Sequence, residues 1–212
     1  EFLLGFGLAL LFLEKFLGRG VLTVLFLVPM MIVPAVSGFV FYLLLQTSGP
    51  VNYLLSAILP GDVELRWLTD PTIAPISVTL VDIWQWTPLM FLILLAGLMA
   101  VPEDQIQAAD ILGASWYQKL RHVVLPIVKP IILIALIIRG MEAFKIFDAA
   151  WLLTQGGPGE VSSTISVKLY REAFQNSQWS YVAALAIVVM IFVSVAASQA
   201  IKPLEQRQEG SA

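Results

Sequence analysis

Three side chains capable of binding or proton chemistry recur at helical spacing within the apolar residues 74–100. Asp82, Gln85 and Trp86 stand at positions i, i+3 and i+4, so one face of a helix would carry all three. A carboxylate inside a membrane-spanning helix is costly, and it commonly faces protein or a water-filled pathway. We expect these residues either to line such a pathway or to hold structure together near the outer interface. Trp84 and Trp86 would equally suit an interfacial aromatic belt.

A second polar group lies in the apolar segment at residues 127–147. Arg139, Glu142 and Lys145 recur at steps of three and therefore lie along one side of a helix. We predict an ion pair between Arg139 and Glu142; the alternative is that both contact the hydroxyl groups of a sugar. A membrane enzyme using Asp82 and Glu142 as acid and base is disfavoured, because neither has a recognisable nucleophile or metal partner nearby in the sequence.

A polar stretch at residues 102–126 joins these two segments and is predicted to form two short helices. Pro102 and the acids after it suit a helix start, because proline is tolerated in the first turn and acids complement the positive end of the helix dipole. Ser115 suits the cap of the second helix, and Pro126 suits the first turn of the helix that follows. Small residues would let another backbone approach closely; they are Ala108, Ala109, Gly113 and Ala114.

The spacing within this stretch resembles the cytoplasmic coupling motif of bacterial ABC importer permeases. That motif is Glu-Ala-Ala, then a glycine, then Leu-Pro, and the matching residues here are Gln107, Ala108, Ala109, Gly113, Leu125 and Pro126, with Asp110 and Ala114 beside them. Gln107 replaces the usual glutamate, so it can hydrogen-bond a partner but cannot form an ion pair. Other stretches of the chain resemble the carbohydrate-importing branch of the family, namely residues 49–52, 67–68, 83–84, 88, 96–98, 147–148 and 153–158. Without these matches, an amphipathic helix on the membrane surface would be the simpler interpretation.

Composition indicates a multi-span helical membrane protein. Of 212 residues, 58% are hydrophobic and 13% are charged, about half the charged share of globular domains. The net charge of −3 argues against nucleic-acid binding, and the absence of cysteine excludes disulfides and thiolate metal sites. The chain shows no second domain, and it lacks the G-x-x-x-x-G-K-[ST] pattern that cradles nucleotide phosphates.

Five apolar segments are predicted to cross or enter the membrane: residues 2–16, 21–45, 74–100, 127–147 and 181–201. Pro29 and Pro34 fall inside the second, where a kink needs neighbours that satisfy the freed carbonyl groups. Successive loops alternate between the two sides of the membrane when most basic residues are placed in the cytoplasm. This arrangement puts residues 102–126 in the cytoplasm. The chain starts inside an apolar run, so we expect an upstream segment with at least one more span.

The resemblance implies a polytopic, all-α permease of the type I ABC importer fold in the bacterial inner membrane. Residues 1–201 would form the transmembrane domain, with coupling helices at 102–121, and residues 202–212 a disordered cytoplasmic tail. The implied partners are a second homologous permease, two ATP-binding subunits and an extracytoplasmic solute-binding protein. ATP and Mg²⁺ would bind those ATPase subunits, and this chain would bind no cofactor and catalyse no reaction.

The implied function is ATP-driven import of a sugar or oligosaccharide by alternating access. A polyol or glycerophosphodiester is the alternative cargo. An ATP-independent secondary transporter, using the same intramembrane charges for proton coupling, is the rival mechanism.

Overall fold

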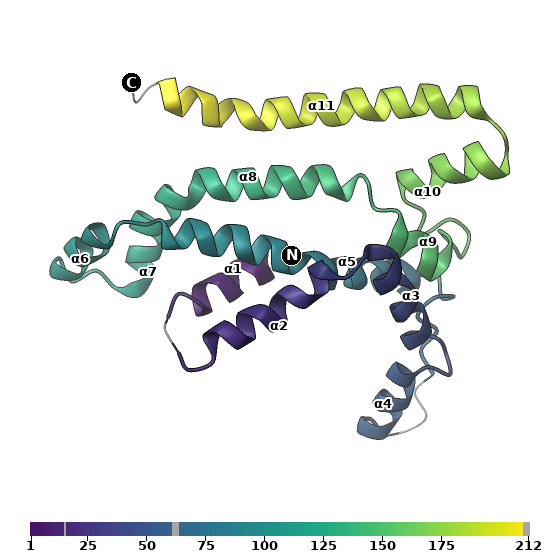
Figure 1. Cartoon of the computed structure of the whole chain (residues 1–212), viewed down its shortest axis with the longest axis horizontal. Helices are drawn as coiled ribbons and strands as arrows, with labels where there is room; N and C mark the ends of the chain where they lie inside the picture. Colours follow the sequence, from purple (N-terminus) through teal and green to yellow (C-terminus); the bar gives the residue numbers. More distant parts are fainter. Residues whose placement is uncertain (15, 61–63, 210–212) are drawn as a thin grey trace. The chain divides into compact units, whose positions relative to one another are not determined.

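A computed structural model describes residues 1–14, 16–60 and 64–209, and all regular elements in these residues are helices (Figure 1). In chain order they are α1 (Phe2–Leu11), α2 (Arg19–Met31), α3 (Pro34–Leu44), α4 (Pro50–Ile58), α5 (Ile73–Met99), α6 (Glu103–Ile111), α7 (Trp116–Lys119), the π-helical turn η1 (Leu120–Val124), α8 (Leu125–Ala143), α9 (Asp148–Thr154), α10 (Ile165–Tyr170), the π-helical turn η2 (Arg171–Gln175) and α11 (Trp179–Glu209).

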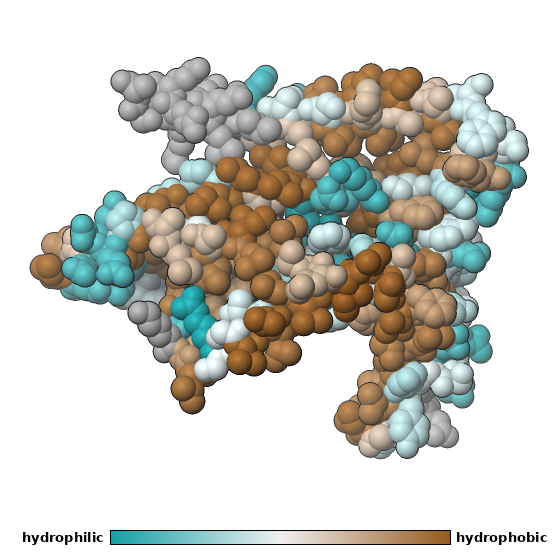
Figure 2. All heavy atoms as spheres, in the orientation of Figure 1, coloured by the Kyte–Doolittle hydropathy of each residue, from teal (hydrophilic) through white to brown (hydrophobic). Residues whose placement is uncertain are grey.

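Three helices in the described residues are long and apolar enough to cross a membrane: Ile73–Met99, Trp116–Ala143 and Trp179–Ala200. These correspond to the third, fourth and fifth predicted segments. Large apolar side chains are exposed along α2 and α11, and Figure 2 shows apolar surface over α2 and α8 with polar surface gathered at α6 and α7. Lipid would cover such a surface, since transmembrane helices expose apolar side chains to hydrocarbon.

The segment predicted at residues 21–45 is divided into α2 and α3, which meet at an angle of 94°. Pro34 occupies the first turn of α3 and has no N–H to continue the hydrogen-bond ladder of α2. The residue before it, Val33, is extended with ψ near 129°, as residues before proline tend to be. The predicted kink is therefore a full break. The first predicted segment is shorter than a crossing, because α1 spans Phe2–Leu11.

Contacts divide the chain into two compact units, a division that the sequence did not reveal. The first unit comprises Glu1–Leu27, Thr87–Met141 and the residues from Val195 onward. Its core is apolar and centres on the fully buried Phe91 and Leu94 of α5. Gly97 brings α5 close to α8, because a Cβ atom there would lie 2.9 Å from Cγ2 of Ile131.

The second unit comprises Val28–Trp86 and Glu142–Ser194. Its core joins α5, α9 and α10 through buried side chains, namely Val78, Val81, Ala150, Leu153 and Val167. Asn52 of α4 holds the residues on both sides of that helix. Its side-chain amide donates to the carbonyl oxygens of Thr47 (2.8 Å) and Leu65 (2.9 Å), and Nε1 of Trp67 donates to Asn52 Oδ1 (2.8 Å).

The final helix extends beyond the predicted last span. α11 runs from Trp179 to Glu209, so the expected boundary at residue 201 is not a break in secondary structure. Residues 210–212 of the predicted tail lie outside the described residues. The assignment of residues 1–201 and 202–212 to a membrane domain and a tail stays a prediction.

Candidate functional site

The polar stretch between α5 and α8 folds as two short helices joined by a tight turn, as predicted. α6 begins after Pro102 and carries Glu103 and Asp104 in its first turn. α7 begins with a capping box: the Ser115 N–H donates to Gln118 Oε1 (2.8 Å), and the Gln118 N–H donates to Ser115 Oγ (3.4 Å). Both helix starts are thus fixed by local chemistry.

Gly113 and an ion pair shape this turn. Gly113 has φ of +72°, a left-handed conformation that costs most L residues roughly 1 kcal/mol or more, and a Cβ atom there would meet nothing within 4 Å. Lys119 Nζ lies 2.6 Å from Asp110 Oδ1, which joins α7 to α6. The glycine is therefore needed for the backbone path and not for lack of space, and the ion pair braces the turn.

The tip of this turn exposes large apolar side chains. Ile111 is 87% exposed, Leu112 86%, Trp116 64% and Tyr117 59%. We call these four residues the tip patch. Gln107 and Ala108 are also exposed, whereas Ala109 is buried and Ala114 is half-buried. Adjacent apolar side chains exposed beside polar helices are typical of a surface that a protein partner covers. Our sequence analysis missed Ile111 and Leu112; an apolar pair next to a glycine in a polar stretch is the signal that identifies them.

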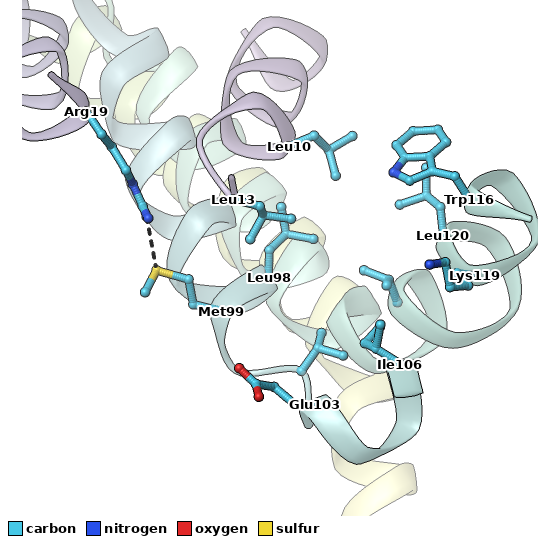
Figure 3. A pocket seen from close by; sticks show the side chains of 12 residues that line it. Leu10, Leu13, Arg19, Leu98, Met99, Glu103, Ile106, Trp116, Lys119 and Leu120 are labelled. Carbon is cyan, nitrogen blue, oxygen red and sulfur yellow. Dashed lines mark hydrogen bonds between the residues drawn. The ribbon is translucent and has the colours of Figure 1, made fainter. Parts of the chain in front are cut away.

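A groove of about 490 Å³ lies beside the turn, within the first unit. Figure 3 shows Trp116 and Leu120 facing Leu10 and Leu13 across this groove. A guanidinium N–H of Arg19 points to the Met99 sulfur at 3.8 Å. The groove therefore leaves space between α7 and the apolar residues near the start of the chain.

No break separates α7 from the following span. α7, η1 and α8 form one helical stretch, Trp116–Ala143. Pro126 lies in the first turn of α8, as predicted, but α8 continues the preceding helical turns, so Pro126 does not mark the start of a separate helix. The preceding turn widens to a π-helix, in which the Leu125 N–H donates to the Leu120 carbonyl oxygen. Proline would clash with the carbonyl group four residues earlier in a regular helix, and π-turns are a known way to accommodate such disruptions.

Gln85 has a structural position within the second unit. Its side-chain amide donates to the carbonyl oxygens of Pro29 and Ile32, both at 2.8 Å, at the break between α2 and α3. Ser37 Oγ donates to Gln85 Oε1. Gln85 is only 3% exposed, so it satisfies carbonyl groups that the break frees.

Asp82 and Trp86 are partly exposed on the same helix. Asp82 lines a small pocket of about 250 Å³ together with Ser162, Ser163 and Thr164. The three side chains that share the predicted helix face therefore have different neighbours. Asp82 lines a pocket with hydroxyl-bearing residues, and Gln85 donates to backbone carbonyl groups.

The predicted Arg139–Glu142 pair is wrong. Arg139, only 8% exposed, donates from Nε and Nη2 to the carboxylate of Glu1, with 2.8 Å between Nη2 and Oε1. Glu142 instead accepts from Lys145 Nζ at 2.8 Å. A bidentate arginine–carboxylate contact is geometrically favoured over the single contact that a partner three residues along the helix would offer.

Sequence comparisons agree with this architecture. Residues 1–207 match the family described as "Binding-protein-dependent transport system inner membrane component". The chain is 34% identical over 194 residues to the trehalose/maltose transport system permease protein MalF of Thermococcus litoralis, covering 91% of this chain and 65% of that protein. It is 35% identical over 197 residues to the trehalose transport system permease protein SugA of Mycobacterium tuberculosis, covering 93% of this chain and 62% of that protein. The chain thus spans less than two thirds of the length of these relatives.

A solved structure shares the fold. A bacterial ABC transporter involved in import of the acidic polysaccharide alginate aligns with a TM-score of 0.86 at 24% identity, covering 97% of this chain and 72% of that one. The expected resemblance to ABC importer permeases is confirmed, as are the all-helical permease fold and the multi-pass location in the cell membrane. The chain belongs to the family of binding-protein-dependent transport system inner membrane components.

Proposed function

We propose that this chain is the permease subunit of an ATP-driven importer that receives a sugar or oligosaccharide from an extracytoplasmic solute-binding protein. Relatives named for trehalose and maltose transport support the cargo class. A solved importer with the same fold forms a complex with an alginate pentasaccharide-bound periplasmic protein, which supports the delivery route. A second homologous permease would complete the pore, and a polyol or glycerophosphodiester is the alternative cargo.

The observation that carries this proposal is the tip patch on a braced turn. Exposed apolar side chains flank Gly113, and the Lys119–Asp110 pair and the capping box hold both helices in place. We assign the contact with a separate ATP-binding subunit to this turn, in particular to Gln107, Ala108, Ala109, Asp110, Gly113 and Ala114, with Leu125 and Pro126 at the start of the span. ATP and Mg²⁺ would be held by that partner, and this chain would bind neither.

Transport would then follow by alternating access. Closure of the ATPase dimer would displace the turn, and the span that continues from α7 would carry this displacement into the membrane. Gln107 would hydrogen-bond the partner without an ion pair, so apolar contact from the tip patch would supply most of the docking free energy.

Within the spans, the substrate pathway would be lined by Asp82, Trp86, Arg139 and Glu142. Aromatic faces and planar polar groups commonly bind the apolar faces and hydroxyl groups of sugars. Gln85, the fifth residue predicted for this pathway, would instead support it by holding the break between α2 and α3.

The test replaces Ile111 and Leu112 by serine in the complete transporter. Because both side chains are exposed, the permease should fold normally, while the ATPase subunit should no longer copurify and uptake of trehalose or maltose should be lost. The matched control is the other exposed Ile-Leu pair, Ile58 and Leu59 on the opposite predicted side, whose serine variants should transport normally.

Two outcomes would contradict the proposal. The first is full uptake and an intact complex in the Ile111→Ser, Leu112→Ser variant. The second is uptake that stops when the proton gradient is collapsed but persists without ATP, which would favour the secondary-transporter mechanism.

A further inference from the structure

A hollow of about 720 Å³ lies in the second unit and is distinct from the pocket of Asp82. We call it the α3–α9 hollow, after the two helices that form its walls. These two helices are in close contact, because a Cβ atom on Gly38 of α3 would be 3.1 Å from Cδ1 of Leu152 in α9. The lining residues are Phe39, Tyr42, Leu45, Gln46, Thr47, Ser48, Leu68, Thr69, Leu152, Leu153, Thr154 and Gln155.

One wall carries an aromatic platform. The rings of Phe39 and Tyr42 are stacked with 6.5 Å between their centroids and 21° between their planes. Phe39 is 56% exposed and Tyr42 36%, so the platform is accessible and is not part of the core. These two rings expose apolar aromatic surface of the kind that packs against the carbon face of a pyranose ring.

The rim is polar and uncharged. None of the residues that line the hollow is Asp, Glu, Lys or Arg. Within the described part of the chain, the side chains of Gln46, Ser48, Thr69 and Gln155 make no hydrogen bond to other protein groups, so their amides and hydroxyls are available to a ligand. Neutral donors and acceptors around an apolar platform suit a neutral ligand rich in hydroxyl groups.

Gln155 provides an independent sign that this rim is specialised. It ends α9 with φ of +52°, in the left-handed region where a helix normally places glycine or asparagine. A glutamine there costs stability, and residues in such conformations concentrate at ligand sites. Gln155 lines the hollow together with Gln46 and Ser48.

We propose that the α3–α9 hollow is a contact site for a neutral oligosaccharide, beside loops that the charge pattern of the sequence predicts to lie outside the cell. The inference rests on the proposed import function and narrows its substrate class. None of the lining residues is a cation, and the nearby Arg171 is already paired with Glu160 at 2.6 Å, so a neutral sugar should bind better than an acidic one. A sugar bound here would stack on Phe39 and Tyr42 while its hydroxyl groups reach the amides of Gln46 and Gln155.

The test measures sugar binding to the purified transporter in detergent by saturation-transfer NMR, with maltose, trehalose and an alginate oligosaccharide as probes. The two neutral sugars should bind and the acidic one should not. Phe39→Ala and Tyr42→Ala should each raise the Kd about three- to tenfold, the loss expected for one aromatic contact. Tyr53→Ala removes an aromatic side chain that is 78% exposed outside the hollow, and it should leave the Kd unchanged.

Gln155 separates a binding role from a structural one. Gln155→Gly removes both the amide and the backbone strain, so it should weaken binding while the melting temperature stays equal or rises. Gln155→Asn keeps an amide on a residue that tolerates this conformation, and it should bind better than the glycine variant. A residue important only for folding would lower stability and binding together.

Several results would overturn the inference. The first is that neither neutral sugar binds, and the second is that the Kd is unchanged in both aromatic variants. The third is preferential binding of the acidic probe, and the fourth is displacement of the sugar signal by added phospholipid. Each of these leaves the proposed import function standing, because that function is tested separately at Ile111 and Leu112.

Discussion

Gln85 provides the sharpest test of how this membrane fold is held together. We predict that Gln85→Met, a change of similar length without donors, destabilises the permease by about 2–4 kcal/mol. The amide currently donates to two carbonyl groups at the α2–α3 break. Methionine fills the same space, so the loss should come from hydrogen bonding and not from a cavity.

The size of this loss depends on which hydrogen bonds the two carbonyl groups retain in the Gln85→Met variant. The Pro29 carbonyl oxygen still accepts from the Ile32 N–H at 3.3 Å, so losing Gln85 costs it one bond, about 1 kcal/mol. In the part of the chain that the structure describes, the Ile32 carbonyl oxygen accepts only from Gln85, and stranding it costs about 1–3 kcal/mol. Without Gln85, the single hydroxyl proton of Ser37 can be donated to the Pro34 carbonyl oxygen, which lies 2.9 Å from Ser37 Oγ, so this side chain adds little to the loss.

Equilibrium unfolding in mixed micelles measures this change. Gln178→Met is the matched control, because Gln178 is exposed and the same substitution there should change the free energy of unfolding by less than about 0.5 kcal/mol. A Gln85→Met variant as stable as this control would refute the reasoning, and it would mean that water or lipid headgroups satisfy the break instead.

Three further predictions test other contacts. Gly97→Ala should destabilise the permease by about 1–3 kcal/mol because its Cβ atom would meet Ile131, whereas Gly140→Ala, with open space around it, should be neutral or slightly stabilising; thermal unfolding compares the two. Asn52→Ala should cost about 2–4 kcal/mol in the same assay, since three hydrogen bonds are lost. Lys119→Met should impair sugar uptake while changing stability by less than about 1 kcal/mol, because the Asp110 pair is partly exposed; normal uptake would contradict the bracing role of that pair.

Local signals in the sequence predicted the turn between α6 and α7 well. Proline, early acids and a serine cap act within one helical turn, so α6 and α7 begin where the sequence indicates. Apolar length is also a local signal, and three of the five apolar segments that it predicted are single helices long enough to cross a membrane. Proline chemistry predicted a disturbance at Pro34, but its angle depends on packing around the break, which no local pattern contains.

Long-range pairing was beyond the sequence. Arg139 and Glu142 look like partners because they are three residues apart, yet Arg139 contacts Glu1, 138 positions away. Gln85 shares a helix face with Asp82, and only the tertiary structure shows that its amide is directed to the backbone of α2. The α3–α9 hollow joins residues from three segments, so spacing along the chain could not indicate it.

The unbroken helix from Trp116 to Ala143 has a mechanical consequence. Ser115 at its start and Arg139 near its end are about 36 Å apart at 1.5 Å per residue, roughly the thickness of the hydrocarbon layer. A continuous helix of this length would turn a small tilt at its Trp116 end into a sideways displacement at the far end. Two features of this helix depart from regular α-helical hydrogen bonding, the wide π-turn at Leu120–Val124 and Pro130, so the stiffness at these two places would set how much of the displacement reaches the far end.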